Sequence, residues 1–472
     1  MSVWCVAFCE ECAGGVCGVK KMIDRKTLID DFCQKAKEGK AAFFIGAGIS
    51  KPYGLPKFKE LVHEEMAGKI DYAGEIDDCP EMMQYILNET GDDKAFYDGI
   101  KHRFDIPYDE SRSSYLSSVA KSNITTIWTT NFDVLIEDAL DKQEKAHETK
   151  RCETDFKNEY ANRGDVEVIK IHGDIESDRI VLTKRDYEDF NIEHKLAIKR
   201  LENDMLSKCF MFVGYSYNDP NIRLIVNNIR QLLDCDTKSI CHYLLLRKEK
   251  DDNEQKLQKL WLKDLKRYGI NVYLYNDYDE IAEILSQICS KSKGKTVFVT
   301  GSHMENSCTF AEELGKRLID IPDLEVNYGQ SEGIGKIFCN SFAQTVIDRK
   351  LPLENYLNIY VNPYAFCKDW DNKDSIMPYL KTLRCKMFRH TQVLIAFPGK
   401  KGTLAEISQA IKEGTLVIPV FMKNGSYKNE VIAANPGIIE NLVKIDESFA
   451  QKVQDSLITI DDLVDFLERI FN

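Results

Sequence analysis

The chain has 472 residues, of which 43% are hydrophobic and 29% charged, with only 12 prolines and 26 glycines. This is the composition of a globular protein of two or three domains, and it excludes a collagen-like, mucin-like or wholly disordered chain. Lysine and arginine total 63 against 76 aspartate and glutamate, which gives a formal charge of −13. An acidic chain of this kind argues against a nucleic-acid partner, which would need basic surface, but leaves room for a local phosphate pocket.

The chain contains no run of about 18 apolar residues, so no membrane-spanning helix and no membrane partner are predicted. The first residues lack the order of a secretory signal, because acids interrupt their apolar part and lysines follow it. The 15 cysteines are therefore expected to be reduced thiols of a cytoplasmic protein. We expect residues 1–25 to be a disordered leader. The alternative is a zinc site formed by four cysteines in this leader: Cys5, Cys9, Cys12 and Cys17.

The first block of the chain alternates helical and strand patterns. An amphipathic helix is predicted over 27–38, followed by a continuous apolar strand over 41–45 and a glycine turn over 46–50. A continuous apolar strand that enters a glycine turn is typical of a buried parallel strand in a nucleotide-binding sheet. Further buried strands are predicted at 124–128, 166–171, 209–213 and 242–246, with helices that include 134–140 and 278–289.

A second, smaller block follows a short polar linker over 290–295. Its strands are predicted at 296–300, 357–361, 393–397 and 416–421. Parallel strands with helical crossovers give a doubly wound sheet. The sequence therefore predicts an α/β protein with two such parallel-sheet domains, 26–291 and 295–472.

Polar segments follow four of the predicted strands in the first block. They are the glycine turn at 46–50, TTNFD at 129–133, KIHGD at 170–174 and GYSYNDPN at 214–221. The carboxyl ends of parallel strands converge on the crevice where such sheets bind ligands. Glycine lets phosphate approach the backbone, and the helix expected after the turn favours negative charge. We therefore expect a dinucleotide crevice here.

His172 is the main acid–base candidate, because a neutral imidazole can take a proton from a ribose hydroxyl or a water. The alternative is a structural histidine. Asn131 could hold a ribose hydroxyl or a water through its amide, or cap the next helix. Asp133 and Asp174 could be caps or partners of basic groups, and Asp219, before a proline, could be a turn residue.

These motifs, with Gly54-Leu55-Pro56 and in this order, resemble the sirtuin-like domains of prokaryotic antiviral defence proteins over residues 26–290. The resemblance implies that the glycine loop holds NAD phosphates, and that His172 and Asn131 flank the nicotinamide ribose as catalytic residues. No CxxC pair of a zinc ribbon lies between Asn131 and Cys289, so we expect no metal, and cleavage of NAD by water rather than deacylation. No cofactor is expected beyond NAD as the substrate. The expected NAD contacts are Gly46, Ala47, Gly48, Ser50, Asp133, Gly214, Ser216 and Asp219.

The second block carries a strand that ends at Gly301-Ser302, a glycine-rich turn (Gly329, Gly333 and Gly335), and the run PGKKGTLAE over 398–406. This run resembles the PGGxGTxxE loop of SLOG domains, whose LOG members cleave nucleoside monophosphates. Lys400 replaces the second glycine, which favours binding over hydrolysis. Lys400 and Lys401 could also be a solvated turn, and Thr403 with Glu406 a capping box. The expected ligand contacts are Gly301, Ser302, Arg384, Lys401, Gly402, Thr403 and Glu406.

A sirtuin-like domain followed by SLOG resembles the effectors of Thoeris antiphage systems. That resemblance implies an NAD glycohydrolase in a homotetramer that depletes NAD. Its implied activator is a cyclic ADP-ribose isomer, made by a partner TIR-domain protein, which binds the SLOG domain. Two alternatives remain: a nucleotide-binding regulator that does not cleave NAD, and a LOG-like phosphoribohydrolase in the second domain.

Overall fold

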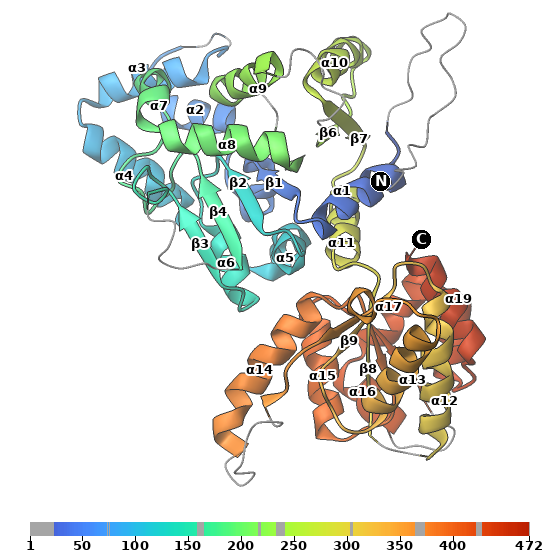
Figure 1. The fold of residues 1–472 in the computed structure, drawn as a ribbon. Helices are drawn as coiled ribbons and strands as arrows, with labels where there is room; N and C mark the ends of the chain where they lie inside the picture. Colours follow the sequence, from blue (N-terminus) through green and yellow to red (C-terminus); the bar gives the residue numbers. More distant parts are fainter. Residues whose placement is uncertain are drawn as a thin grey trace, which may run out of the picture.

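The computed structural model of the chain contains two parallel sheets, one in each half of the sequence (Figure 1). It describes residues 23–72, 74, 76–157, 165–215, 219–232, 241–302, 305–363, 373–421 and 427–471. The predicted class, α/β with two doubly wound parallel-sheet domains, is confirmed. The four leader cysteines and Ser216 lie outside the described residues.

The first sheet has the strand order β3-β4-β2-β1-β5-β6-β7, and all its strands are parallel. Its strands are β1 (Ala41–Ile45), β2 (Thr126–Thr129), β3 (His147–Lys150), β4 (Val166–Lys170), β5 (Cys209–Val213), β6 (His242–Arg247) and β7 (Ile270–Tyr275). The chain leaves β1 towards β2 and later returns to β5 on the other side of β1. This reversal places a ligand crevice at the carboxyl end of β1.

Helices cover both faces of this sheet, which explains why β1 and β5 are apolar at every position. Along β1, Phe43 packs into the core that contains α1 and α11, whereas Ala42 and Phe44 pack into the core that contains α8 and α9. The helices are α1 (Arg25–Lys37), α2 (Phe58–Met66), α3 (Cys79–Thr90), α4 (Asp93–Phe104), α5 (Ser114–Lys121), α6 (Leu135–Lys142), α7 (Lys184–Glu193), α8 (Lys195–Ser207), α9 (Pro220–Leu232), α10 (Asp252–Leu265) and α11 (Asp279–Lys291).

The second sheet has the order β10-β9-β8-β11-β12, again all parallel, with its own hydrophobic core. The chain reverses between β8 and β11, so the crevice of this sheet lies beside the end of β8. Its strands are β8 (Thr296–Thr300), β9 (Glu325–Tyr328), β10 (Leu357–Ile359), β11 (Val393–Ala396) and β12 (Leu416–Pro419). Its helices are α12 (Glu305–Arg317), α13 (Ile334–Asp348), α14 (Lys373–Arg389), α15 (Lys401–Lys412), α16 (Tyr427–Ala434), α17 (Gly437–Ile445), α18 (Glu447–Gln454) and α19 (Ile460–Phe471).

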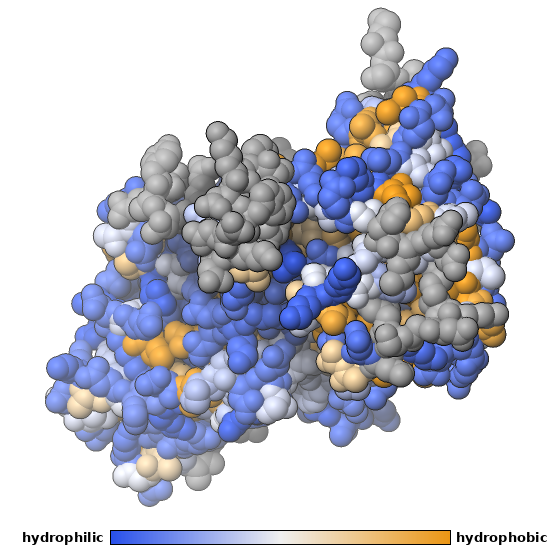
Figure 2. Space-filling view, turned by 90° about the horizontal axis from the view of Figure 1, so that it is seen from below, coloured by the Kyte–Doolittle hydropathy of each residue, from blue (hydrophilic) through white to orange (hydrophobic). Residues whose placement is uncertain are grey.

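The surface seen from below in Figure 2 is mostly hydrophilic, and its hydrophobic residues form separate small groups. Within the described ranges, no helix combines the length and the apolar character needed to cross a bilayer.

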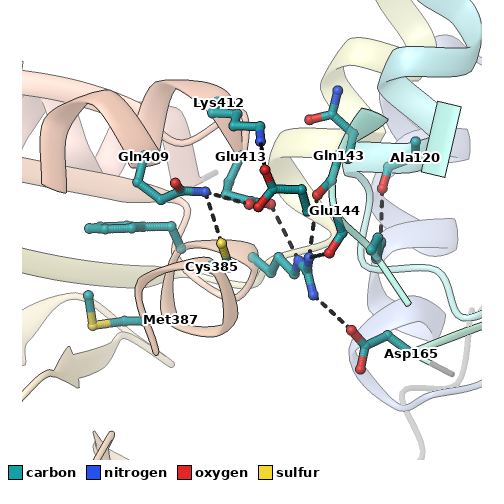
Figure 3. Close-up of polar contacts among 12 residues, drawn as sticks. Ala120, Gln143, Glu144, Asp165, Cys385, Met387, Gln409, Lys412 and Glu413 are labelled. Carbon is teal, nitrogen blue, oxygen red and sulfur yellow. Dashed lines mark hydrogen bonds and ion pairs between the residues drawn. The ribbon is translucent and has the colours of Figure 1, made fainter. Parts of the chain in front are cut away.

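The two domains meet in an ionic junction at the ends of α14 and α15 (Figure 3). Arg389, the last residue of α14, is 8% exposed and donates hydrogen bonds to Asp165 Oδ2 at 2.8 Å and to the carbonyl oxygen of Glu144 at 2.6 Å. Its Nε lies 3.5 Å from Glu413 Oε2, just beyond the end of α15. Lys412 Nζ also reaches across, to Glu144 Oε1 at 3.0 Å. The junction therefore joins both helices to the loop that follows α6.

Candidate active site

The four polar segments follow four consecutive strands of the first sheet, in the order β4-β2-β1-β5. KIHGD ends β4, TTNFD ends β2, the glycine turn ends β1, and Gly214 begins the segment after β5. All four strands run in the same direction, so the segments lie side by side along one edge. The sheet therefore assembles the crevice residues that the sequence singled out.

The glycines of the β1 turn pack directly on the end of β5. The Gly46 N–H donates to the carbonyl oxygen of Val213 at 3.0 Å, and the Gly48 N–H donates to that of Gly214 at 2.8 Å. A Cβ at Gly46 would lie 2.7 Å from Gly214 O, and one at Gly48 would lie 2.8 Å from Gly214 Cα. Close packing of the two turns therefore requires both glycines, independently of any phosphate.

The helix expected directly after this turn is wrong. One three-residue 3₁₀ segment, Ala47–Ile49, lies within the turn and a second, Lys51–Tyr53, follows it, and the next α-helix is α2 at Phe58. Such short segments carry little macrodipole, so the helix-terminus argument for negative charge does not apply at this turn.

Asn131 is held by two hydrogen bonds to its neighbours, and its side-chain oxygen forms none. It is 5% exposed, its Nδ2 donates to Ser50 Oγ at 3.1 Å, and its backbone N–H donates to Thr129 Oγ1 at 3.0 Å. Its Oδ1 is buried without a hydrogen-bond partner. Asn131 does not cap α6, so that alternative is wrong. Asp133 takes the related role, since its Oδ1 accepts from the Leu135 N–H at 3.2 Å.

His172 lies beneath two aromatic rings of α7. The ring centroids of Tyr187 and Phe190 are each 5.7 Å from the centroid of the imidazole and meet it edge-on. The imidazole is 3% exposed, and its Nε2 has no hydrogen-bond partner. Burial lowers the pKa of His172, partly opposed by the charges of Asp219 and Asp186, so the ring is neutral near pH 7. The side chains of Tyr187 and Phe190 thus contribute to the burial of this ring.

Asp219 contacts both a helix end and the histidine. Its Oδ1 accepts hydrogen bonds from the N–H groups of Asn221 at 2.9 Å and Ile222 at 3.1 Å, so the turn role is correct. Its Oδ2 accepts from the Tyr187 hydroxyl at 3.2 Å and lies 3.4 Å from His172 Nε2. At 3.4 Å and without hydrogen-bond geometry, the two atoms are neighbours that form no hydrogen bond, and the pair becomes ionic only when the imidazole is protonated. Sequence reasoning missed Tyr187, since nothing in the pattern of α7 connects it with the crevice.

Asp174 is a structural carboxylate. It is fully buried, and its Oδ2 accepts from Arg151 Nε at 2.8 Å. Lys170 Nζ lies 3.7 Å from the same oxygen. The interpretation of Asp174 as a partner of basic groups is therefore correct.

The second crevice lies where β8 and β11 end. A Cβ at Gly301 would lie 2.6 Å from Phe397 Cβ, and Ser302 Oγ accepts from the Lys400 N–H at 3.2 Å. Lys400 is exposed and precedes α15, whose first two residues, Lys401 and Gly402, are also exposed. Five of the seven expected contacts, Gly301, Ser302, Lys401, Gly402 and Thr403, thus lie around the start of this helix.

Glu406 is a partly buried carboxyl group of this crevice. Its side chain is 16% exposed, its Oε2 accepts from the Thr300 hydroxyl, and Arg384 Nε lies 3.9 Å from its Oε1. Burial raises its pKa, opposed by the Thr300 hydrogen bond and the Arg384 charge. The capping box of Thr403 and Glu406 is wrong, because the residue at the helix start is Lys400 and Glu406 bonds to β8 instead.

Comparisons with known proteins agree with this architecture. Residues 125–273 match the model of the SIR2-like domain family. The NAD(+) hydrolase ThsA of Bacillus cereus (strain MSX-D12) is 34% identical over 83% of this chain and 86% of its own length. The NAD(+) hydrolase ThsA of Cytobacillus dafuensis is 32% identical over 84% and 85%. Defense-associated sirtuin 2 of Bacillus subtilis is 27% identical over 45% of this chain and 21% of its own.

The similarity to the two hydrolases extends through both sheets and does not stop at the SIR2-like segment. Identity above 30% over more than four-fifths of each chain means that the protein belongs to the NAD(+) hydrolase ThsA family.

Proposed function

We propose that this protein hydrolyses NAD to nicotinamide and ADP-ribose at the carboxyl edge of its first sheet, as a defence enzyme that depletes NAD. One observation carries the proposal. His172 Nε2 and Asn131 Oδ1 are both buried at neighbouring strand ends without a hydrogen-bond partner. Buried polar atoms are normally satisfied, and an unsatisfied pair at a crevice is a sign that a ligand completes it.

The chemistry requires little of the protein beyond these groups. Nicotinamide leaves NAD as a neutral molecule, so the main tasks are to stabilise the positive charge on the ribose and to deliver water. A neutral imidazole at His172 can accept a proton from a ribose hydroxyl or from the attacking water. The free Asn131 oxygen can hold that hydroxyl or water in position. The glycine turn, Ser50, Asp133, Gly214, Ser216 and Asp219 are proposed to line the NAD site.

We further propose that the enzyme is gated. The rings of Tyr187 and Phe190 cover His172, and the Tyr187 hydroxyl is bonded to Asp219 beside it. A catalytic imidazole packed under side chains of a separate helix is expected of an enzyme that stays idle until it is activated. The activator needs to bind the open state more tightly than the closed state.

The proposed activator is a cyclic ADP-ribose isomer from a TIR-domain partner, bound in the second crevice of a homotetrameric protein. A cyclic ADP-ribose carries phosphates, which suit the exposed amides and lysine at the start of α15. Gly301, Ser302, Arg384, Lys401, Gly402, Thr403 and Glu406 are the proposed contacts. The buried Glu406 beside Arg384 is also the feature that favours the second candidate function, a LOG-like phosphoribohydrolase.

Purified protein incubated with NAD, with and without cyclic ADP-ribose isomers, tests these proposals through released nicotinamide. Nicotinamide is expected only with the activator. It should vanish in His172→Ala but persist in His102→Ala, which changes an exposed histidine of α4. If no condition releases nicotinamide, the protein is a nucleotide-binding regulator instead. Release of base from a nucleoside monophosphate would assign the second crevice to hydrolysis.

A further inference from the structure

A lysine is buried completely beneath the candidate active site. Lys170 is the last residue of β4, two positions before His172, and its side chain is 0% exposed. Its ammonium donates a hydrogen bond to the carbonyl oxygen of Asp133 and lies 3.3 Å from Glu137 Oε1 and 3.7 Å from Asp174 Oδ2. Lysine is almost never buried without partners, so this network holds the charge in place.

The carboxylates around this ammonium depend on it. Asp133 and Glu137 are 2% and 5% exposed, and burial raises the pKa of both, while the charge of Lys170 opposes the rise in each case. Asp174 has a second cation, since Arg151 Nε donates to it at 2.8 Å. Lys170, whose ammonium is bonded to the backbone carbonyl of Asp133, is thus the positive charge that most favours the ionised form of the Asp133 carboxyl group.

The ionisation of Asp133 sets the direction of a hydrogen-bond chain. An ionised carboxylate can only accept, so Asp133 Oδ2, at 2.9 Å from Ser50 Oγ, takes the hydroxyl proton of Ser50. Ser50 Oγ then has only lone pairs to offer Asn131, and the Asn131 amide turns its NH₂ to Ser50 at 3.1 Å. The Asn131 oxygen is the atom left free, as an acceptor.

A protonated Asp133 would reverse the chain. Its carboxyl group could donate to Ser50, whose hydroxyl would then donate to the Asn131 oxygen. The amide would turn over and leave its NH₂ free, so the site would offer a donor in place of an acceptor. An acceptor is what holds a ribose hydroxyl or a water by its proton.

We propose that Lys170 is a positioning residue of this site: its ammonium fixes the direction of the chain from Asp133 through Ser50 to Asn131, so that the Asn131 oxygen is free to accept from the substrate. The proposal rests on the proposed function, because it gives Asn131 its task in NAD cleavage. Lys170 itself touches no substrate and acts through the polarity of three side chains.

The test compares Lys170→Met with the wild type in the full-length, activated protein. Methionine keeps the length of the side chain and removes its charge. We expect kcat for nicotinamide release to fall about 10²-fold near pH 7 while KM changes little, because one catalytic group is misoriented. We also expect activity to recover as pH rises, since a higher pH ionises Asp133 again. The kcat of the wild type should reach its maximum at a lower pH than the kcat of Lys170→Met.

A second measurement does not depend on activity. Without Lys170, the native state keeps a proton on a buried carboxyl group that the unfolded chain loses, so the native state binds more protons. The melting temperature of Lys170→Met should therefore fall, relative to the wild type, as pH rises from about 5 to 8. Activity and stability would change in opposite directions with pH, which a merely damaged fold does not produce.

Lys145→Met is the matched control, because Lys145 is 6% exposed and donates to the carbonyl oxygens of Ala120 and Ser122. Lys145→Met should lose stability, yet its kcat should depend on pH in the same way as that of the wild type. If Lys170→Met is too unstable, the double variant Lys170→Met/Glu137→Gln removes one of the uncompensated carboxylates and should show the same pH limb. A lysine variant with wild-type kcat, or with a pH-independent loss, would overturn the proposal. If the wild type releases no nicotinamide but Lys170→Met still shows the predicted pH dependence of its melting temperature, only the NAD function is refuted.

Discussion

Arg389→Met tests whether the domains are held together by the buried junction of Figure 3. The substitution removes the donor to Asp165 and to the carbonyl oxygens of Gln143 and Glu144, at 3.4 and 2.6 Å for the two carbonyls. It also leaves the Glu413 carboxylate, whose side chain is 2% exposed, without the arginine. An uncompensated buried charge is the costly part of this change.

The expected loss is about 3–5 kcal/mol in the free energy of unfolding, the range for removing one partner of a buried pair. For a domain the size of the second one, this corresponds to a fall of at least about 6 °C in melting temperature. Differential scanning calorimetry measures it, and the early transition should be that of the second domain.

Lys381→Met is the matched control. Lys381 also reaches across the junction, to Glu144 Oε2 at 2.8 Å, but its side chain is 59% exposed. Exposed pairs contribute about 0–1 kcal/mol, so this variant should melt close to the wild type. If the two variants melt within about 2 °C of each other, burial does not decide the strength of the junction and the reasoning is refuted.

Three further predictions concern the two crevices. Gly48→Ala should destabilise the first domain by at least about 1–3 kcal/mol by urea unfolding, since its Cβ would press on the Gly214 backbone; an unchanged midpoint contradicts this. Asn131→Ala should keep the melting temperature, because the amide caps no helix, yet lower turnover about 10²-fold in the nicotinamide assay. Burial raises the pKa of Glu406, so its ionisation costs stability in the native state as pH rises, and Glu406→Gln should gain stability relative to the wild type from about pH 5 to pH 8. If the difference in melting temperature between Glu406→Gln and the wild type is the same at both pH values, burial does not raise the pKa of Glu406.

Most of the strands could be predicted because the sheets are covered on both faces. A strand such as β1 is then apolar at every position and stands out in the sequence. Three strands were not predicted. β3 is an edge strand with the sequence HETK, and β7 is the other edge. β9 carries Asn327, which is buried but satisfied by the carbonyl of His390 and the hydroxyl of Thr391. None of the three is a continuous apolar run buried at every position, as β1 is, so no local pattern reveals these strands.

The candidate site divides in a similar way. Asn131 and His172 could be picked out because they follow predicted strands at the carboxyl edge. Lys170 and Tyr187 could not, because their importance comes from which side chains they meet after folding. A lysine that ends a strand is usually solvated, and only the closed network of Asp133, Glu137 and Asp174 makes this one exceptional.

Gating by the second domain requires a physical path to the first site, and α6 supplies one. It begins at Leu135, whose N–H is bonded to Asp133, and ends at Lys142, directly before the Gln143 and Glu144 carbonyls that accept from Arg389. Its eight residues span about 12 Å at 1.5 Å per residue. A helix this short moves as a rigid body. In the proposed gated enzyme, a shift of α14 and α15 would move the residues that orient Asn131, whereas the rings packed on His172 belong to α7 and would need a separate movement. The proposed activation would therefore involve two elements, of which the junction would control one.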